Sequence, residues 1–359
     1  MPDAIPNPGY STAPAPRTLS RLGAIVRAGE WWEYKLVPIL GLFYATAILI
    51  GAPVASLWPA ALTLLLALAP GAAWVSLIND IADRSEDAAA GKPNRMAGRP
   101  TGFMAAAAGL PLLAGLAFAW LWRGDGLLLG CYLAAWASFA LYSIPPFRLK
   151  TRGLAGLLAD AAGSNLFPGL VAILLAFRAA GVSPDPYWLC AAGAWALAYG
   201  IRGILWHQLL DLDNDRAAGV RTFAQRHPDG RAAALGKYLV FPAELAALAI
   251  LLVMLREPAA AAALALHAWL TWLRLDRFRM QASAVEPGPR HMILLQEYYD
   301  LFLPLALLIA SAVQFPIDLL AIAAHLLLFP RRAIHVARDC WKLRAMRLHR
   351  RREARASGG

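Results

Sequence analysis

Nine apolar stretches alternate with polar connections along this chain. They cover roughly residues 36–54, 57–78, 103–122, 126–144, 154–177, 187–206, 234–255, 258–275 and 298–316. Most are close to the roughly 20 residues that a helix needs to cross the hydrocarbon core of a bilayer. They are too long for strands and rich in Leu and Ala. The pattern predicts an all-α protein, a polytopic membrane bundle of about nine transmembrane helices around a central cavity.

The two ends of the chain differ from this apolar part. Residues 1–30, rich in proline and polar residues, predict a flexible arm, and 31–323 hold the predicted transmembrane domain. Residues 324–359 predict a basic amphipathic tail. Nine spans would place that tail on the face opposite the N-terminus, unless residues 300–330 form a hairpin that returns. The sequence leaves both arrangements open.

The chain is basic, with a net charge of +11, and 59% of its residues are hydrophobic. A positive charge can indicate nucleic-acid binding, but here Lys and Arg lie in the tail and in alternate loops. The loops 79–101, 145–153, 207–232 and 276–297 are basic, whereas the connections between them are nearly neutral. By the positive-inside rule we expect an integral protein of the cytoplasmic membrane, with the acidic motifs facing the cytoplasm and no nucleic-acid partner.

Two acidic motifs each follow an apolar run directly. Residues 79–87 read NDIADRSED and residues 211–215 read DLDND. Asp80, Asp83 and Asp87 are spaced i, i+3 and i+7, which puts them on one face of a helix. Carboxylates this close repel one another unless a cation lies between them. Ionisable residues at a membrane helix end are therefore candidates for a functional site.

The two motifs also repeat one another. Residues 83–91 and 211–219 both read D-x-x-x-D-x-A-A-G. A duplicated helix–loop unit would aim two acidic helix ends at one cavity, an arrangement known for intramembrane sites between repeats. Hard cations such as Mg²⁺ prefer oxygen ligands and often bridge carboxylates to substrate phosphates. The pair of motifs therefore predicts metal ions on either side of a diphosphate, whose leaving charge they would neutralise.

Basic residues near both motifs could complete a diphosphate site. Guanidinium and ammonium groups bind phosphate oxygens. The candidates are Lys92, Arg95, Arg148, Lys150 and Arg221.

These motifs resemble those of the UbiA family of intramembrane prenyltransferases. Residues 79–87 fit that family's N-D-x-x-D-x-x-x-D motif, and residues 211–222 are similar to its second motif. The loop 142–153, YSIPPFRLKTRG, resembles the family's loop between the fourth and fifth spans. The resemblance covers roughly residues 30–315 and includes three motifs in order.

The resemblance implies a Mg²⁺-dependent transfer of a prenyl group from a prenyl diphosphate to an acceptor, with diphosphate release. The implied metal ligands are Asn79, Asp80, Asp83, Asp87, Asp211 and Asp215, of which Asp83, Asp87, Asp211 and Asp215 are also the implied catalytic residues. Arg148 and Lys150 would contact the diphosphate. The other implied partners are membrane lipid and an acceptor that the sequence does not identify, such as an aromatic quinone precursor or another acceptor of a lipid pathway.

Three alternatives stay open. One is a family member that moves phosphoribose onto a prenyl phosphate. His207 and Gln208 stand where many members have Asn-Asp, and this departure matches no acceptor class. Another is a transporter with acidic ion sites, although loop aspartates flanked by basic residues argue against it. A third is a scaffold that acts through its tail.

Two further polar residues have open roles. His207 could be an acid–base group or a hydrogen-bonded residue at a helix end. Asn165 could pack against other helices or contact the acceptor, and packing is favoured.

Overall fold

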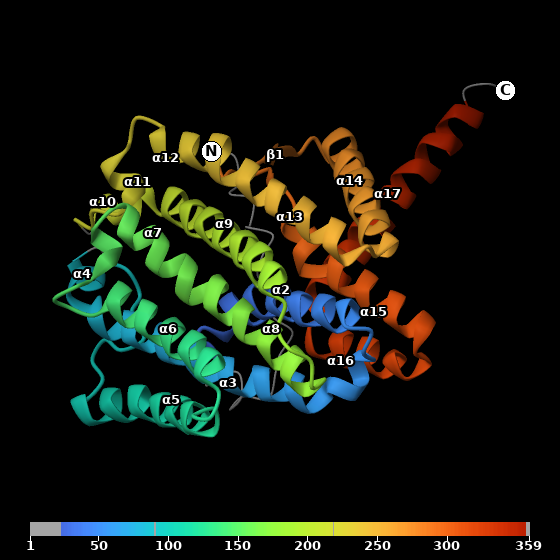
Figure 1. Ribbon diagram of the computed structural model, residues 1–359. Coiled ribbons are helices and arrows are strands. Elements are labelled where there is room, and N and C mark those ends of the chain that lie inside the picture. The colour runs from blue at the N-terminus through green and yellow to red at the C-terminus, as the bar shows by residue number, and fades with distance from the viewer. Residues whose placement is uncertain (1–22, 90, 218, 357–359) are drawn as a thin grey trace.

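The computed structural model describes residues 23–89, 91–217 and 219–356, with side chains placed as far as Met346 (Figure 1). Residues 1–22 of the predicted arm lie outside this part. The main helices are α2 (Ala28–Leu49), α3 (Trp58–Ala82), α5 (Thr101–Leu121), α6 (Gly126–Ser143), α7 (Leu154–Ala161), α8 (Phe167–Ala179), α9 (Pro186–Leu210), α13 (Phe241–Leu255), α14 (Pro258–Phe278), α15 (Leu303–Gln314), α16 (Leu319–Leu328) and α17 (Pro330–Ala356).

Short elements lie between these helices. The short α-helices are α4 (Arg84–Ala89), α10 (Leu212–Ala217), α11 (Phe223–Arg226) and α12 (Arg231–Leu235). The 3₁₀ and π turns are η1 (Val54–Leu57), η2 (Leu149–Thr151), η3 (Ala162–Leu166), η4 (Gly236–Val240), η5 (Tyr298–Phe302) and η6 (Pro316–Asp318). Two strands, β1 (Gln281–Ser283) and β2 (His291–Ile293), pair in parallel before the last membrane segment.

All nine predicted stretches are helical, which confirms the all-α membrane bundle. Within the described residues, six helical segments are long and apolar enough to cross a membrane; they are Val54–Ala82, Thr101–Leu121, Gly126–Ser143, Leu154–Ala179, Pro186–Leu210 and Arg231–Leu255. α2 and α14 have 22 and 21 residues but fall outside that group. The last predicted stretch is shorter, since Tyr298–Gln314 and Pro316–Leu328 form two adjoining apolar segments.

The core is built around α2. Every residue from Leu36 to Ala47 is buried, so this helix is covered on all sides. It packs against α8 and α15, while α3 packs against α5, and α9 packs against α7 and α13. By contrast, α5 lies at the edge of the bundle (Figure 1), where only Met104 and Gly115 are buried. The apolar residues of α5 therefore face outward, as expected for a helix in contact with lipid.

α15 and α16 form a hairpin that returns the chain. Asp318 at the turn accepts hydrogen bonds from Val54 N (3.0 Å) and Ala55 N (2.6 Å) and from the Ser311 hydroxyl. After the hairpin, the first amides of α17 meet the start of α2, because Arg331 N and Arg332 N each donate to Glu33 at 3.1 Å. Of the two arrangements left open, the structure has the returning hairpin, and the basic tail begins at the end of the bundle where α2 starts.

A charged pair is buried between α9 and α13. Arg202 donates to both carboxylate oxygens of Glu244, at 2.5 and 2.7 Å, and Tyr299 Oη donates to the same carboxylate at 2.9 Å. Arg202 also donates to the Ala284 carbonyl at 3.1 Å, which ties the strand-containing loop to the bundle. A buried charge is tolerated only when such partners satisfy it.

We predict that Glu244→Ala lowers the free energy of unfolding by about 3–5 kcal/mol, because it leaves the Arg202 guanidinium buried without a counter-charge. Thermal unfolding of the purified protein in detergent measures this loss. Glu257→Ala is the matched control: Glu257 only caps α14 through Ala259 N (3.0 Å), and losing a cap costs about 1 kcal/mol. The double variant Arg202→Met with Glu244→Leu should recover most of the loss. Equal losses in Glu244→Ala and Glu257→Ala would contradict the role of the pair.

Candidate functional site

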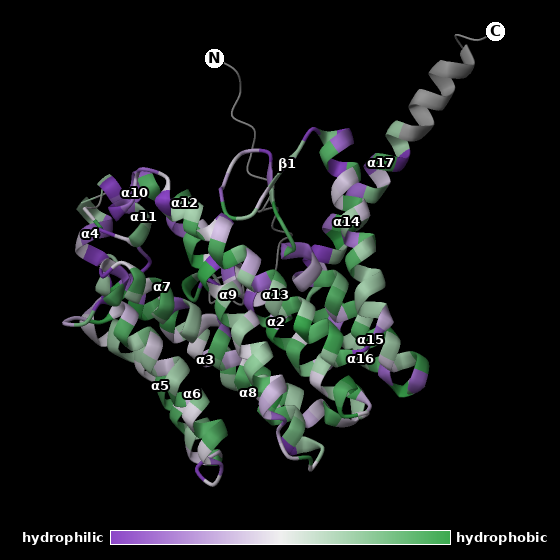
Figure 2. Cartoon of the chain, turned by 45° about the horizontal axis from the view of Figure 1, so that its top comes forward, coloured by the Kyte–Doolittle hydropathy of each residue, from purple (hydrophilic) through white to green (hydrophobic). Residues whose placement is uncertain are grey.

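The two acidic motifs lie at the same end of the bundle. Asp83 follows α3 and Asp211 follows α9, and the short helices α4 and α10 come next in each case. Hydrophilic residues gather where α4, α10 and α11 meet (Figure 2). Lys92, just beyond the first motif, places its Nζ 3.7 Å from Asp215 Oδ1 of the second. One lysine side chain therefore connects the two motifs.

The sequence repeat has the same backbone structure in both copies. Asp87 N donates to the Asp83 carbonyl and Asp215 N to the Asp211 carbonyl, each at 2.8 Å. Each copy then turns at its glycine, Gly91 with φ +66° and Gly219 with φ +67°, a conformation that residues with a Cβ rarely adopt. Each copy of the repeat therefore forms the end of a long helix, then a short helix, and then a turn at a glycine with positive φ.

Basic residues of the loop after α6 hold the first motif. Arg148 donates to both oxygens of Glu86 at 2.5 Å and to Asp83 at 2.9 Å, and Lys150 Nζ also contacts Asp83. The hydrogen bonds that Arg148 donates to Glu86 raise the pKa of Arg148 above its usual value, against the opposing effect of burial. Glu86 is therefore the main partner of Arg148, since both of its carboxylate oxygens accept from that guanidinium.

Asp80, the deepest carboxylate of the motif, is almost fully buried, with 2% of its surface exposed. Arg27 lies 3.2 Å from its Oδ1 and Arg95 lies 3.6 Å from its Oδ2. Arg95 also reaches Glu30 at 3.5 Å. The start of α2 thus closes over the first motif, a contact that the sequence pattern did not indicate for Arg27 or Glu30.

Two polar residues that the sequence reasoning missed position the first motif. Ser143, at the end of α6, donates to Asn79 Oδ1. Asn94 Nδ2 donates to Asp87 Oδ2 at 2.7 Å and to the Asp80 carbonyl at 2.8 Å. Ser143 belongs to the segment YSIPPFRLKTRG and Asn94 to the loop after the first motif, but nothing in either pattern singles out these two residues.

The second motif has fewer partners. Asp215 accepts from Thr222 Oγ1 at 3.3 Å, and burial raises the pKa of its carboxyl while Lys92 opposes that rise. Asp211 accepts from Asn214 at 3.3 Å. Four of the five predicted basic residues contact motif carboxylates; Arg221 is exposed and forms no ion pair with another residue of the described chain.

The motif side chains suit a hard divalent cation by donor type. They offer carboxylate and amide oxygens, which Mg²⁺ prefers. Asp80 Oδ2 is buried and has no hydrogen-bond partner in the structure, so a cation would satisfy it. The described part of the chain contains no group of three or more His, Cys, Asp or Glu side chains arranged to hold a metal ion. Instead of facing a shared metal position, each of the motif aspartates contacts an Arg, Lys, Asn or Thr side chain of the protein.

A cavity of about 230 Å³ extends from these motifs into the bundle. Asn79 lines its motif end, and Ala67 and Ile39 lie further along α3 and α2. Twelve helical residues separate Asn79 from Ala67, or about 18 Å at 1.5 Å per residue. Aromatic side chains form much of one wall, including Trp74 and Trp136. The cavity is therefore long and largely apolar, with charged groups at one end.

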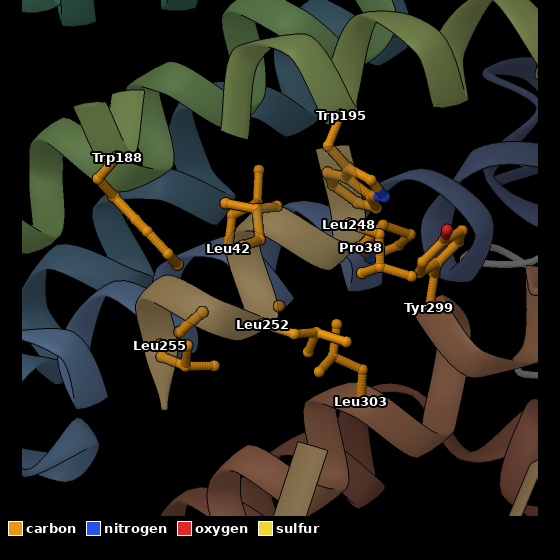
Figure 3. Close-up of a pocket in the computed structure, with 12 residues that line it drawn as sticks. Pro38, Leu42, Trp188, Trp195, Leu248, Leu252, Leu255, Tyr299 and Leu303 are labelled. Atoms are coloured by element: carbon orange, nitrogen blue, oxygen red, sulfur yellow. The ribbon is translucent and has the colours of Figure 1, made fainter. Parts of the chain in front are cut away.

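A second, smaller pocket of about 30 Å³ lies among α2, α9, α13 and α15 (Figure 3). Leu42, Trp195, Leu252 and Leu303 point into it from these four helices. Its lining is apolar and holds no motif residue, so it contributes no chemistry to the candidate site.

This helical membrane fold, with paired acidic motifs above an apolar cavity, fits an enzyme of prenyl-group transfer. The model of the UbiA prenyltransferase family matches residues 40–287, more than half of the chain, and the chain belongs to this family. The comparison with curated proteins gives no match.

Solved structures of a UbiA homolog from Archaeoglobus fulgidus share the fold. The structure bound to GPP and Mg²⁺ has a TM-score of 0.54 and 16% identity, and the match covers 82% of this chain and 99% of that one. The structure bound to DMAPP and Mg²⁺ has the same TM-score and identity, and the match covers 81% and 98% of the two chains.

We predict that Gly156→Ala displaces Lys150 and lowers diphosphate release from geranyl diphosphate at least tenfold. A Cβ at Gly156 would lie 2.6 Å from the Leu149 carbonyl oxygen and 3.1 Å from Lys150 Cα, so the turn that carries Lys150 must shift. Gly203→Ala is the control, because a Cβ there meets nothing within 4 Å. Equal activity in the two variants would show that this close approach does not position Lys150.

Proposed function

We propose that this chain is a Mg²⁺-dependent prenyltransferase that moves a prenyl group from a prenyl diphosphate to an acceptor and releases diphosphate. One observation carries the proposal: two acidic motifs, interleaved with basic side chains, stand at the charged end of a long apolar cavity. A prenyl diphosphate has the same division, with a charged head and an apolar tail. Its head would lie among the motifs and its tail along α3 and α6.

The ion pairs of the site can exchange partners when such a substrate binds. A diphosphate with its metal ions brings phosphate oxygens for Lys92, Arg95, Arg148 and Lys150, and cations for the carboxylates that these residues now contact. Each charged side chain would exchange a partner in the protein for one in the bound substrate or metal, so no charge would be left buried and unpaired. The weaker pairs, such as Lys92 with Asp215 at 3.7 Å, would exchange most readily.

The residues divide by role. Asn79, Asp80, Asp83 and Asp87 would hold metal on one side of the diphosphate, and Asp211 and Asp215 on the other. Both solved structures of the Archaeoglobus fulgidus homolog hold a prenyl diphosphate together with Mg²⁺, which supports a metal-assisted diphosphate site. Arg221 would contribute long-range attraction for the anionic head from its exposed position near the second motif.

In the proposed reaction the carbon–oxygen bond of the donor breaks and leaves its electron pair on the diphosphate. Bound metal supplies the charge neutralisation that makes diphosphate a good leaving group. Arg148 and Lys150 would add hydrogen bonds to the departing oxygens. The loop that carries both residues is tied to the loop of the second motif, since Arg226 Nη2 donates to the Thr151 carbonyl at 2.7 Å. Keeping them closed excludes water from the allylic cation.

We also propose that the protein lies in the cytoplasmic membrane, with its motif end toward the cytoplasm. The basic loops are on the motif side of the bundle, and the tail, which carries ten Lys and Arg between residues 331 and 355, starts at the same end. This distribution follows the positive-inside rule. Protease access to the tail in sealed vesicles of known orientation tests it.

We predict that Asp83→Ala and Asp211→Ala each lower diphosphate release from geranyl diphosphate by at least about 100-fold, because each removes a carboxylate proposed to hold metal. Mass analysis of the lipid products separates prenyl transfer from phosphoribosyl transfer. Asp213→Ala is the matched control, since the Asp213 side chain is 98% exposed. Full activity of both Asp83→Ala and Asp211→Ala would refute the assignment of these sites, and solute transport without diphosphate release would favour a transporter.

Metal removal gives an independent prediction. Chelation with EDTA should abolish diphosphate release, and added Mg²⁺ should restore it in the unmodified protein. Because fewer carboxylates weaken the metal site, Asp87→Asn should need a several-fold higher Mg²⁺ concentration for half-maximal activity. Activity that persists in EDTA would contradict the metal-dependent mechanism.

A further inference from the structure

The basic helix α17 has no part in the proposed reaction. It follows the α15–α16 hairpin, and residues 338–355 carry eight Lys and Arg against Asp339 and Glu353. No described residue of α17 lines the cavity of the motifs. Like charges on neighbouring turns of a helix repel one another. A helix of this composition is therefore stabilised by an anionic partner that lies along it.

The first turns of α17 are fixed to the motif end of the bundle. Arg332 Nη2 lies 3.1 Å from Asp300 Oδ2, and the backbone N of Arg332 donates to Glu33 near the start of α2. Two turns later, Asp339 Oδ2 lies 2.9 Å from Arg274 Nη2, near the end of α14. These contacts with buried side chains place the start of α17 at the level where α2 begins and α14 ends.

Beyond these contacts α17 runs across the direction of the bundle. In Figure 1, α8 and α9 run from upper left to lower right, whereas α17 runs toward the upper right and away from the other helices. Figure 2 also shows α17 leaving the bundle. Both α8 and α9 belong to segments that are long enough to cross a membrane. A helix that crosses their direction runs closer to the membrane plane than to the membrane normal.

The neighbouring end of α14 marks this level as a membrane interface. Trp269 and Trp272 of α14 are 56% and 58% exposed. Trp272 comes two residues before Arg274, the partner of Asp339 in α17. Tryptophan side chains gather at the headgroup level of membrane proteins. The free part of α17 therefore begins at the level of the lipid headgroups.

One face of α17 combines exposed apolar and exposed basic side chains. Ile334 and Trp341 are two helical turns apart, so they lie on the same face, and Trp341 is 71% exposed. Arg338 and Lys342 flank this stripe on one side and Arg344 flanks it on the other, and all three are exposed. None of these three forms an ion pair with another residue in the described part of the chain. They are therefore available to an outside partner.

We infer that α17 lies in the membrane interface at the motif end and binds acidic phospholipid headgroups there. Ile334 and Trp341 enter the lipid, and Arg338, Lys342 and Arg344 reach the anionic headgroups beside them. An amphipathic helix with basic residues beside a tryptophan-containing stripe binds membranes in this way. A soluble acidic protein would satisfy the charges but offer no apolar layer to Trp341. The inference is independent of the reaction proposed for the cavity.

The test measures which lipid lies beside α17 in the full-length protein. Cys340, which is exposed next to Trp341, carries a fluorescent label, and Cys190→Ser removes the other exposed cysteine, since Cys131 is buried. The labelled protein is reconstituted in nanodiscs of phosphatidylcholine and phosphatidylglycerol in equal parts. One or the other lipid carries a nitroxide quencher on its acyl chain, at the same mole fraction. The ratio of quenching by the two lipids reports the charge preference at α17.

Two variants with the same net charge separate position from charge. The tail variant combines Arg338→Gln, Lys342→Gln and Arg344→Gln. The matched control changes three exposed basic residues in connections at the opposite end of the bundle, namely Arg123→Gln, Arg178→Gln and Arg256→Gln. Each variant loses three positive charges, so a difference between them depends on where those charges lie.

In the parent protein and the control, we expect quenching by phosphatidylglycerol to exceed quenching by phosphatidylcholine at least about twofold, because basic residues near the surface attract anionic lipid. The preference should disappear in the tail variant, and also in about 1 M NaCl, which screens charges beyond roughly 3 Å. Equal quenching by the two lipids in the parent, or the same preference in the tail variant and the control, would overturn the inference. Absence of quenching by either lipid would place α17 in water and would overturn it as well.

Discussion

Every charge near the membrane needs a partner of opposite charge or a hydrogen bond. The rest of this structure depends on that constraint. At the motif end, the acidic groups and their basic neighbours are arranged so that each carboxylate of the first motif meets a cation or an amide. Opposite charges about 4 Å apart attract by roughly 4 kcal/mol at the effective dielectric of a protein surface. These contacts draw the loops after α3, α6 and α9 together at the motif end of the bundle.

The same constraint is met differently inside the bundle. Arg202 and Glu244 form a short, two-pronged pair that Tyr299 also joins. The pairs of Asp80 and Asp215 are longer, at 3.2–3.7 Å, and their partners are shared or partly exposed. Short and complete pairs hold a fold in one state. Longer pairs hold loops near one another and still permit exchange with a ligand of the right charges, which is what a diphosphate site needs.

Much of this could be predicted from the sequence because membrane helices and paired motifs are local patterns. The nine apolar stretches correspond to helices, and the D-x-x-x-D repeat corresponds to two equivalent helix ends. The sequence could not decide the hairpin at Asp318, because that depends on a carboxylate meeting two amides more than 260 positions earlier in the chain. It also missed Ser143 and Asn94, whose importance comes only from the oxygen atoms they happen to meet across the bundle.

Asp160 shows the limit of sequence reasoning most clearly. It lies within an apolar run, between alanines, and has no motif around it. Only the folded bundle brings it to the same cavity as Lys35 of α2 and His207 of α9. A carboxylate in such a place must either be paired for stability or serve the chemistry. Here the pairing is incomplete, because Lys35 directs its hydrogen bond to Asn165. The fold, and not the local sequence, therefore decides which polar side chains share the cavity with the motif residue Asn79.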